Sequence, residues 1–113
     1  MNKIILVGNL AKDPEVKVIE ESGKTLTKII IAVQRSFKNV EGEREADFIQ
    51  VTFFDKRAEA VAEFLKKGDP ISVSGRLRTG SYEDKEGVKK YTTEVIADEF
   101  QFINGKKSNE NIG

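Results

Sequence analysis

The chain has 113 residues, enough for one hydrophobic core and too few for two, so we expect a single domain. It contains neither cysteine nor histidine, which excludes disulfides, thiolate or imidazole metal ligands, and Cys or Ser–His nucleophiles. Its 19 basic and 19 acidic residues cancel. Global charge therefore gives no support to a polyanionic partner, although basic residues can still gather in a local groove.

The first segment, "MNKIILVGNLAKD", carries a short apolar run. It is not a signal peptide, because Gly8, Asn9 and Lys12 follow without a longer apolar region or a small-residue cleavage site. Nowhere does the chain approach the roughly 20 apolar residues that span a bilayer. We therefore expect a cytoplasmic protein with no membrane partner.

The strand expected over residues 3–9 is apolar on both of its faces. Ile4 and Leu6 point to one side, and Ile5 and Val7 point to the other. A small barrel needs only one inward face, so the second face is either buried under a loop or helix or forms a subunit contact. The pattern does not choose between these alternatives.

Strand-like stretches recur along the chain with turn signals between them. They cover residues 3–9, 16–37, 46–54, 70–82 and 89–103. Glycine stands among polar residues at 20–24, 39–43 and 83–87, which fits hairpin connections that need a positive φ. We expect successive strands to be antiparallel neighbours.

One segment, residues 55–70, is rich in Ala, Glu, Leu and Lys and predicts a short helix. The helix should start near 57 and stop near 67. Asp55 is the expected N-cap, and Gly68 is expected to take the left-handed conformation that ends it.

This order of elements favours an all-β fold with one short helix, the five-stranded Greek-key barrel known as the OB-fold. Other small barrels remain open on pattern alone. Residues 1–104 would form the domain, and the polar residues 105–113 would form a flexible tail.

The stretch "DFIQVTFFDK" places two phenylalanines on the side of a strand opposite its apolar face. Ile49, Val51 and Phe53 alternate on one side, so Phe48 and Phe54 share the other. An exposed aromatic strand face is a candidate platform for stacking the bases of single-stranded nucleic acid.

Basic residues accompany aromatic ones in two further segments. Within 70–82, Arg76 and Arg78 lie on one side of the strand, and Tyr82 lies on the same side further along. At the end of the strand expected over 16–37, Arg35 and Phe37 also share one side. Three interpretations remain open at this point: a buried strand with a solvated basic face, a protein interface, and a nucleic-acid interface.

Enzymatic readings have little support. Glycines occur singly among strand residues rather than in a phosphate-binding loop, and the acidic clusters lie in expected turns without calcium-loop spacing. We expect no enzyme, no metal and no cofactor.

The sequence resembles the bacterial single-stranded DNA-binding proteins from Met1 to about Ile103. The segments that carry the resemblance, in the order and spacing of the family, are "MNKIILVGNLAKDPEVK", "FLKKG", "SGRLRTGSYEDKEG" and "YTTEVIADE". The resemblance implies an OB-fold homotetramer in which the first strand contributes to subunit contact. It also implies a nucleoid-associated protein that protects single-stranded DNA, without sequence preference, in replication, recombination, repair or uptake.

The resemblance carries the stacking positions of the family onto four aromatic residues, Phe37, Phe48, Phe54 and Tyr82. Three of these are commonly Trp in the family, and Phe37, Phe48 and Tyr82 offer less area per base. It assigns phosphate contact to Lys3, Lys56, Lys66, Lys67 and Arg78. The alternation of side chains along the strands adds Arg35 and Arg76 to this set.

Three departures from the family pattern bear on function. Gly80 and Ser81 stand where basic residues are frequent, and Gln50 stands where a cation is common. "KKSNENIG" ends the chain in place of a long linker and acidic tip, so tip-mediated recruitment of replication or repair enzymes is not expected. Nothing in the sequence names a group that reads the RNA 2′-OH, so preference for DNA over RNA stays open.

Overall fold

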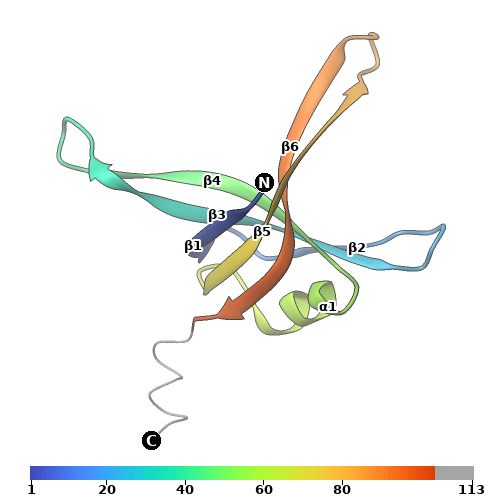
Figure 1. Cartoon of the computed structure of the whole chain (residues 1–113), viewed down its shortest axis with the longest axis horizontal. Coiled ribbons are helices and arrows are strands. Elements are labelled where there is room, and N and C mark those ends of the chain that lie inside the picture. The colour runs from blue at the N-terminus through green and yellow to red at the C-terminus, as the bar shows by residue number, and fades with distance from the viewer. Residues whose placement is uncertain (104–113) are drawn as a thin grey trace, which may run out of the picture.

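The computed structural model describes residues 1–103, which form six strands and one helix (Figure 1). In chain order these are β1 (Ile4–Leu10), β2 (Glu15–Val18), β3 (Thr25–Lys38), β4 (Arg44–Phe54), α1 (Asp55–Phe64), β5 (Pro70–Glu83) and β6 (Lys89–Phe102). The domain end predicted at 104 and the tail predicted over 105–113 lie outside the described residues.

Five of the strands close into a barrel. The order β1-β5-β6-β4-β3 returns to β1 through the pairing of β1 with β3. β2 lies outside this ring and pairs with the first part of β3, on the edge that β1 occupies further along. The predicted all-β fold with one short helix and an OB-fold barrel is confirmed.

The expectation of antiparallel neighbours is confirmed for β2–β3, β3–β4 and β5–β6. The segment predicted as one stretch over 16–37 is divided by its turn into β2 and β3. The pairing of β4 with β6 is parallel and joins strands that are not consecutive. This parallel pairing places β6, which belongs to the β5–β6 hairpin, beside β4, which belongs to the β3–β4 hairpin.

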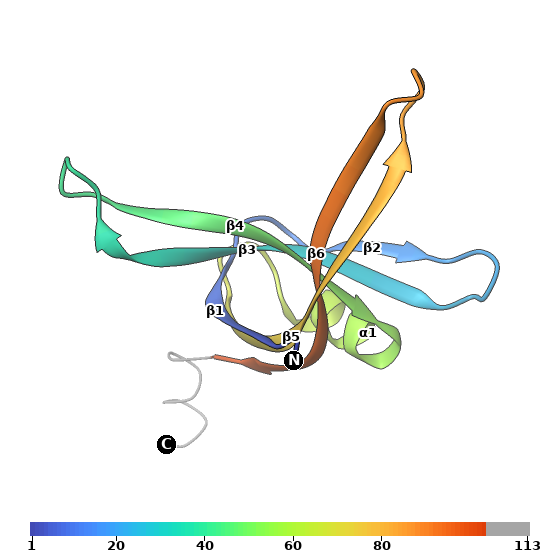
Figure 2. The same cartoon turned by 45° about the horizontal axis from the view of Figure 1, so that its top comes forward.

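The inward faces of the barrel strands make the core. Val51 and Phe53 of β4 are fully buried, as predicted, and Ile49 packs against them from a partly buried position. The Phe53 ring meets the edge of Phe100 with 5.4 Å between centroids. Helix α1 packs against β3 and β4, and Thr27 Oγ1 donates a 2.8 Å hydrogen bond to the Ala58 carbonyl at that contact (Figure 2).

The helix starts and ends earlier than predicted. It runs over Asp55–Phe64, and Asp55 is not its N-cap: Phe54 holds that position and no side-chain cap is made. The end is set by side chains outside the helix, because the Lys66 N–H donates to Asp69 Oδ2 and the Lys67 N–H donates to Asp13 Oδ1. Both amides would otherwise continue the helical ladder.

Gly68 takes the predicted left-handed conformation, with φ +94°, but in the loop that follows the helix. Its N–H donates to the Leu10 carbonyl, which ties this loop to the end of β1. The single helix of residues 1–103, α1, lacks the length and apolarity required to cross a bilayer.

Hairpins project from the barrel at β2–β3, at β3–β4 and at β5–β6 (Figure 1). We call the last two the β3–β4 arm and the β5–β6 arm. Their turns are built alike, because Asn39 Oδ1 and Asp84 Oδ1 each accept hydrogen bonds from two backbone N–H groups of their turn. Gly42 and Gly87 then supply the positive φ. The turns predicted from glycine spacing are confirmed.

Candidate nucleic-acid interface

The pairing of the strands brings most of the predicted site residues to one side of the sheet. Directly opposite residues emerge on the same side, and Thr52 lies opposite Ile96 while Arg78 lies opposite Glu94. We call the resulting surface the outer face. It consists of Phe48, Gln50, Thr52 and Phe54 of β4, Glu94 of β6, and Arg76, Arg78 and Tyr82 of β5.

Three of the four predicted stacking aromatics are exposed. The exposed fraction is 85% for Phe37, 67% for Phe48 and 56% for Tyr82. Phe54, at the end of β4 opposite Leu26, is half-buried, so only part of its ring is accessible to a base. Phe37 lies between Gln34 and Lys38, where the register of β3 with β4 shifts, and the pairing does not assign it to the outer face.

A carboxylate lies at the centre of the outer face. Glu94 Oε1 accepts hydrogen bonds from Thr52 Oγ1 and from Gln50 Nε2, the latter at 3.4 Å, while Glu94 Oε2 accepts one from Arg78 Nη2 at 2.8 Å. Thr52, which sequence alternation places with the outward residues, is fully buried beneath this network.

The network holds Glu94 in its charged form. Partial burial raises the pKa of Glu94, but the hydrogen bonds from Thr52, Arg78 and Gln50, together with the positive charge of Arg78, lower the pKa by more, so the net shift is downward. Arg78 is therefore paired with a full negative charge at neutral pH.

Arg76 has a looser partner. Its Nη1 lies 3.7 Å from Asp98 Oδ1, and both side chains are about half exposed.

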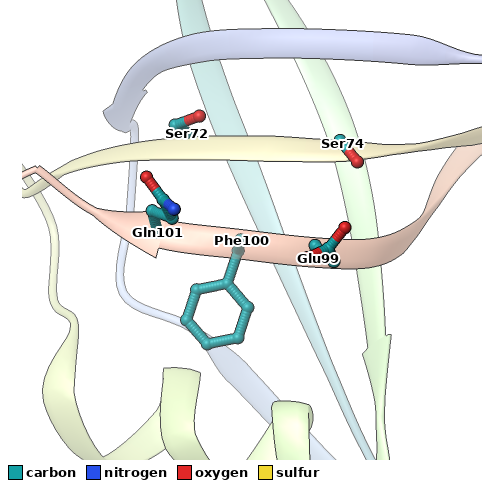
Figure 3. A pocket seen from close by; sticks show the side chains of 5 residues that line it. All are labelled: Ser72, Ser74, Glu99, Phe100 and Gln101. Atoms are coloured by element: carbon teal, nitrogen blue, oxygen red, sulfur yellow. The ribbon is translucent and has the colours of Figure 1, made fainter.

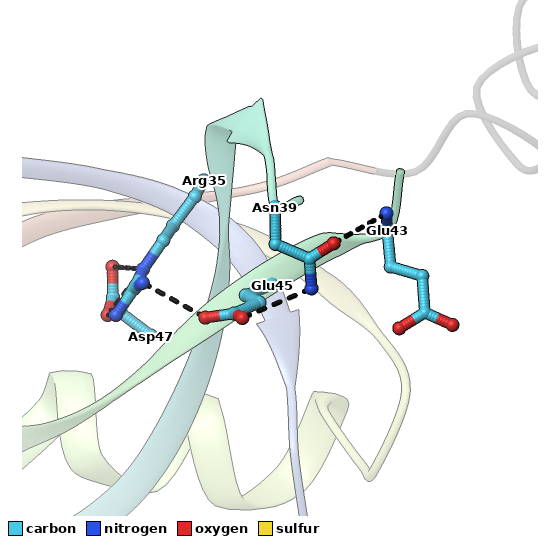
Figure 4. A network of polar contacts seen from close by, with 5 residues as sticks. All are labelled: Arg35, Asn39, Glu43, Glu45 and Asp47. Atoms are coloured by element: carbon cyan, nitrogen blue, oxygen red, sulfur yellow. Dashed lines mark hydrogen bonds and ion pairs between the residues drawn. The ribbon is translucent and has the colours of Figure 1, made fainter. Parts of the chain in front are cut away.

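Arg35 is held by two carboxylates in the β3–β4 arm (Figure 4). Its Nε and Nη2 donate to Asp47, and its Nη1 donates to Glu45 at 3.1 Å. The Arg35 hydrogen bond lowers the pKa of the Asp47 carboxyl and raises the pKa of the guanidinium. Asp47 points to the side of β4 opposite Phe48, so the structure does not bring Arg35 to the outer face.

The four predicted lysines differ from these arginines. All are exposed, and none forms an ion pair with another of residues 1–103. Lys3 precedes β1, Lys56 lies in the first turn of α1, and Lys66 and Lys67 follow the helix.

Comparison with known proteins identifies the family. The sequence model of the Single-strand binding protein family matches residues 1–103. The chain belongs to this family. It is therefore a single-strand binding protein and not an enzyme.

Its relatives are similar over nearly the whole chain. Single-stranded DNA-binding protein 1 of Staphylococcus aureus strain Mu50 is 49% identical over 110 residues, which cover 97% of this chain and 70% of the relative. Single-stranded DNA-binding protein 1 of Clostridium acetobutylicum is 49% identical over 107 residues, or 95% of this chain and 97% of the relative. Single-stranded DNA-binding protein 2 of the same organism is 47% identical over 114 residues, covering 99% and 85%.

One exposed aromatic residue is not among the stacking positions predicted from the sequence. Tyr91 is 77% exposed, and Lys89 Nζ lies 5.8 Å from its ring centre. Tyr91 lies opposite Ser81 and Tyr82 lies opposite Lys90, so the two tyrosines emerge on different sides of the β5–β6 arm. The signal was present in "KKYTT", where a tyrosine follows two lysines.

The second apolar face of β1 is open. Ile5 and Val7 are exposed, so burial of this face under a loop or helix of the described chain is contradicted. They pair with Ser74 and Ser72 of β5, beside a shallow polar hollow that Glu99 and Gln101 complete (Figure 3). Figure 3 shows Phe100 pointing the other way, toward α1.

Proposed function

We propose that the protein binds single-stranded DNA without sequence preference, by stacking bases on exposed aromatic rings. The observation that carries the proposal is the pair Phe48 and Tyr82, two largely exposed rings on the same face as the Glu94–Arg78 pair. Every base has a π-face, so each stack contributes about 1–3 kcal/mol whatever the sequence. Duplex DNA binds poorly, because its paired bases cannot present those faces.

The other two predicted rings take secondary roles. Phe37 extends the stacking path onto the β3–β4 arm, where it is the most exposed of the four. Phe54 offers one side of its ring to a base while the other side packs on the protein.

Phosphate contact falls first to the lysines. Lys3, Lys56, Lys66 and Lys67 are exposed and have no acidic side-chain partner within residues 1–103. Arg35, Arg76 and Arg78 also contact phosphate, but only to the extent that their ion pairs with nearby carboxylates break. Salt weakens binding because each neutralised phosphate releases counterions.

We further propose that the protein works as a homotetramer. Ile5 and Val7 form an exposed apolar strip on β1, and β1 meets β3 only at Asn9 and Leu10. Within residues 1–103 no strand pairs with the rest of that edge, from Ile4 to Val7, and it can pair with the backbone of a second copy. In the cell such an assembly would associate with the nucleoid and protect exposed strands during replication, recombination, repair or uptake.

The test is the affinity of Phe48→Ala for oligo-dT. Removal of the ring should weaken binding by about 1–3 kcal/mol while the free energy of unfolding changes by less than about 0.5 kcal/mol, because the side chain is exposed. Titration by fluorescence anisotropy measures the first, and urea unfolding measures the second.

Val16→Ala is the matched control, since Val16 is an exposed apolar residue on β2, outside the barrel ring. Equal losses of affinity in the two variants, or no loss in either, would remove Phe48 from the stacking path. A competition between oligo-rU and oligo-dT in the same titration decides between RNA and DNA.

A further inference from the structure

We propose that Glu94 competes with DNA phosphate for Arg78 and so limits the affinity of the outer face. The inference rests on the proposed function, because it concerns the same surface. It assigns to Glu94 a positioning and affinity-setting role that neither its burial nor its strand position suggests by itself.

The geometry fixes the carboxylate in place from three directions. Thr52 and Gln50 of β4 donate to one oxygen, and Arg78 of β5 donates to the other. Only 16% of the Glu94 side chain is exposed. Glu94 cannot swing away as a solvated glutamate would, so its charge stays at the centre of the face.

Arg78 is bound but not enclosed. About half of its side chain is exposed, and only Nη2 is used by Glu94. A guanidinium carries five N–H donors, so a phosphate can approach the remaining ones. The phosphate is repelled by the negative charge of Glu94, so phosphate and the Glu94 carboxylate compete for Arg78.

Gln50 supports this interpretation. Its side chain donates to Glu94 Oε1 at 3.4 Å, so the carboxylate that pairs with Arg78 is also the acceptor for a neutral amide. A lysine or arginine at 50 would pair with the same carboxylate and leave Arg78 freer. The neutral amide leaves Arg78 as the only cationic side chain that Glu94 contacts within residues 1–103.

The chain supplies a matched comparison in Arg76 and Asp98. This neighbouring pair is longer, at 3.7 Å, and both partners are about half exposed. Asp98→Asn removes the same unit of charge from β6 without removing a built network. Glu94→Gln keeps an acceptor for Thr52 and neutralises the charge.

The experiment measures oligo-dT binding at sodium chloride concentrations from about 0.05 to 0.3 M for the wild type, Glu94→Gln and Asp98→Asn. Glu94→Gln should bind about two- to five-fold tighter, the range expected for release of one half-exposed ion pair. Its slope of log K against log salt should steepen by about 0.7, because one further phosphate is neutralised. Asp98→Asn should show a smaller change in both.

The same comparison in an Arg78→Ala background identifies the partner, because the effect of Glu94→Gln should then largely disappear. Weaker binding by Glu94→Gln, or an unchanged slope, would overturn the inference. If Glu94→Gln does not fold, as judged by circular dichroism, Arg78→Ala alone decides: a slope change well below 0.7 supports the competition, and a full fall of about 0.7 contradicts it.

Failure of the proposed function gives a different result. A wild type that does not bind oligo-dT at low salt refutes single-stranded DNA binding itself. A wild type that binds, with Glu94→Gln indistinguishable from it, refutes only the role of Glu94.

Discussion

Phe48 and Phe54 lie on the same side of β4, yet their surroundings differ. Phe48 lies in the half of β4 nearer the hairpin turn and is largely exposed, whereas Phe54 ends the strand opposite Leu26 and is half-buried. Phe54→Ala should therefore lower the free energy of unfolding by about 2 kcal/mol, while Phe48→Ala leaves it nearly unchanged. Urea unfolding of both variants measures this difference, and equal stabilities would show that the two rings are equally exposed.

Glu94 gives a second prediction at this scale, because its pKa in the folded protein is lowered. A carboxylate with a lowered pKa stabilises the fold above its unfolded pKa of about 4.3, and that stabilisation is lost as pH falls through the folded value. Unfolding free energies at pH 7 and pH 3 should differ less in Glu94→Gln than in the wild type.

Glu59→Gln on the exposed side of α1 is the control for that comparison, since it makes the same chemical change without a hydrogen-bond network. If the pH dependence of Glu94→Gln equals that of Glu59→Gln, the network does not contribute to stability.

The alternation of residues along β4 correctly predicted which side chains point to its outer side, but it could not predict which other residues cover them. The covering of Thr52 depends on the parallel pairing of β4 with β6, which joins residues far apart in the sequence. Arg78 was predicted as a phosphate contact without its partner Glu94, although Glu94 lies opposite it in the β5–β6 hairpin, 16 residues along the chain. Arg35 is a similar case, because its partners Asp47 and Glu45 also lie in its own hairpin, and their acidity was visible in "EREAD".

At the scale of the elements, the sequence predicted those features that depend only on residues close together in the chain. The turns follow from Asn or Asp and Gly at fixed spacing, and the strands follow from alternation. The end of α1 could not be predicted this way, because Asp13 and Asp69 take the amides that would continue it. The acceptor Asp13 lies more than 50 residues from its donor Lys67.

Gly75 tests the closure of the barrel. It sits at the irregularity between β5 and β6, and a Cβ there would lie 2.1 Å from the Ile96 carbonyl oxygen. Gly75→Ala should therefore cost about 1–3 kcal/mol of stability, as overpacking does.

Gly80 is the matched position on the same strand, since a Cβ there would meet only the Thr92 hydroxyl at 3.1 Å, in the exposed arm. Gly80→Ala should be nearly neutral. Thermal unfolding of the two variants measures the difference, and a neutral Gly75→Ala would mean that the backbone at the irregularity can move apart.

At the scale of the whole molecule, the open face of β1 leads to a prediction about assembly. Val7→Glu places a charge on the exposed strip that we propose as a subunit contact, so it should lower the molecular mass measured by light scattering while the fold is retained. Val16→Glu on β2 is the control and should leave the mass unchanged. A wild type that is monomeric at micromolar concentration would contradict the homotetramer directly.

The zero net charge of the chain gave no support to binding of a polyanion, and the structure shows how the charges are distributed. The three arginines predicted for phosphate contact are paired with acidic residues, whereas the four predicted lysines form no ion pair within the described residues 1–103. The protein is thus neutral overall while its exposed lysines remain available to a polyanion. Such a distribution cannot be read from composition, because it depends on which charges the fold brings together.

The central claim, that exposed rings of the outer face bind single strands by stacking, is tested most directly by titration of oligo-dT and of duplex DNA of equal length at one salt concentration. The wild type should bind the single strand, should bind the duplex far more weakly, and should lose about 1–3 kcal/mol for the single strand on Phe48→Ala. Equal affinity for single strand and duplex, unchanged by Phe48→Ala, would contradict the account, because only phosphate contact would then remain.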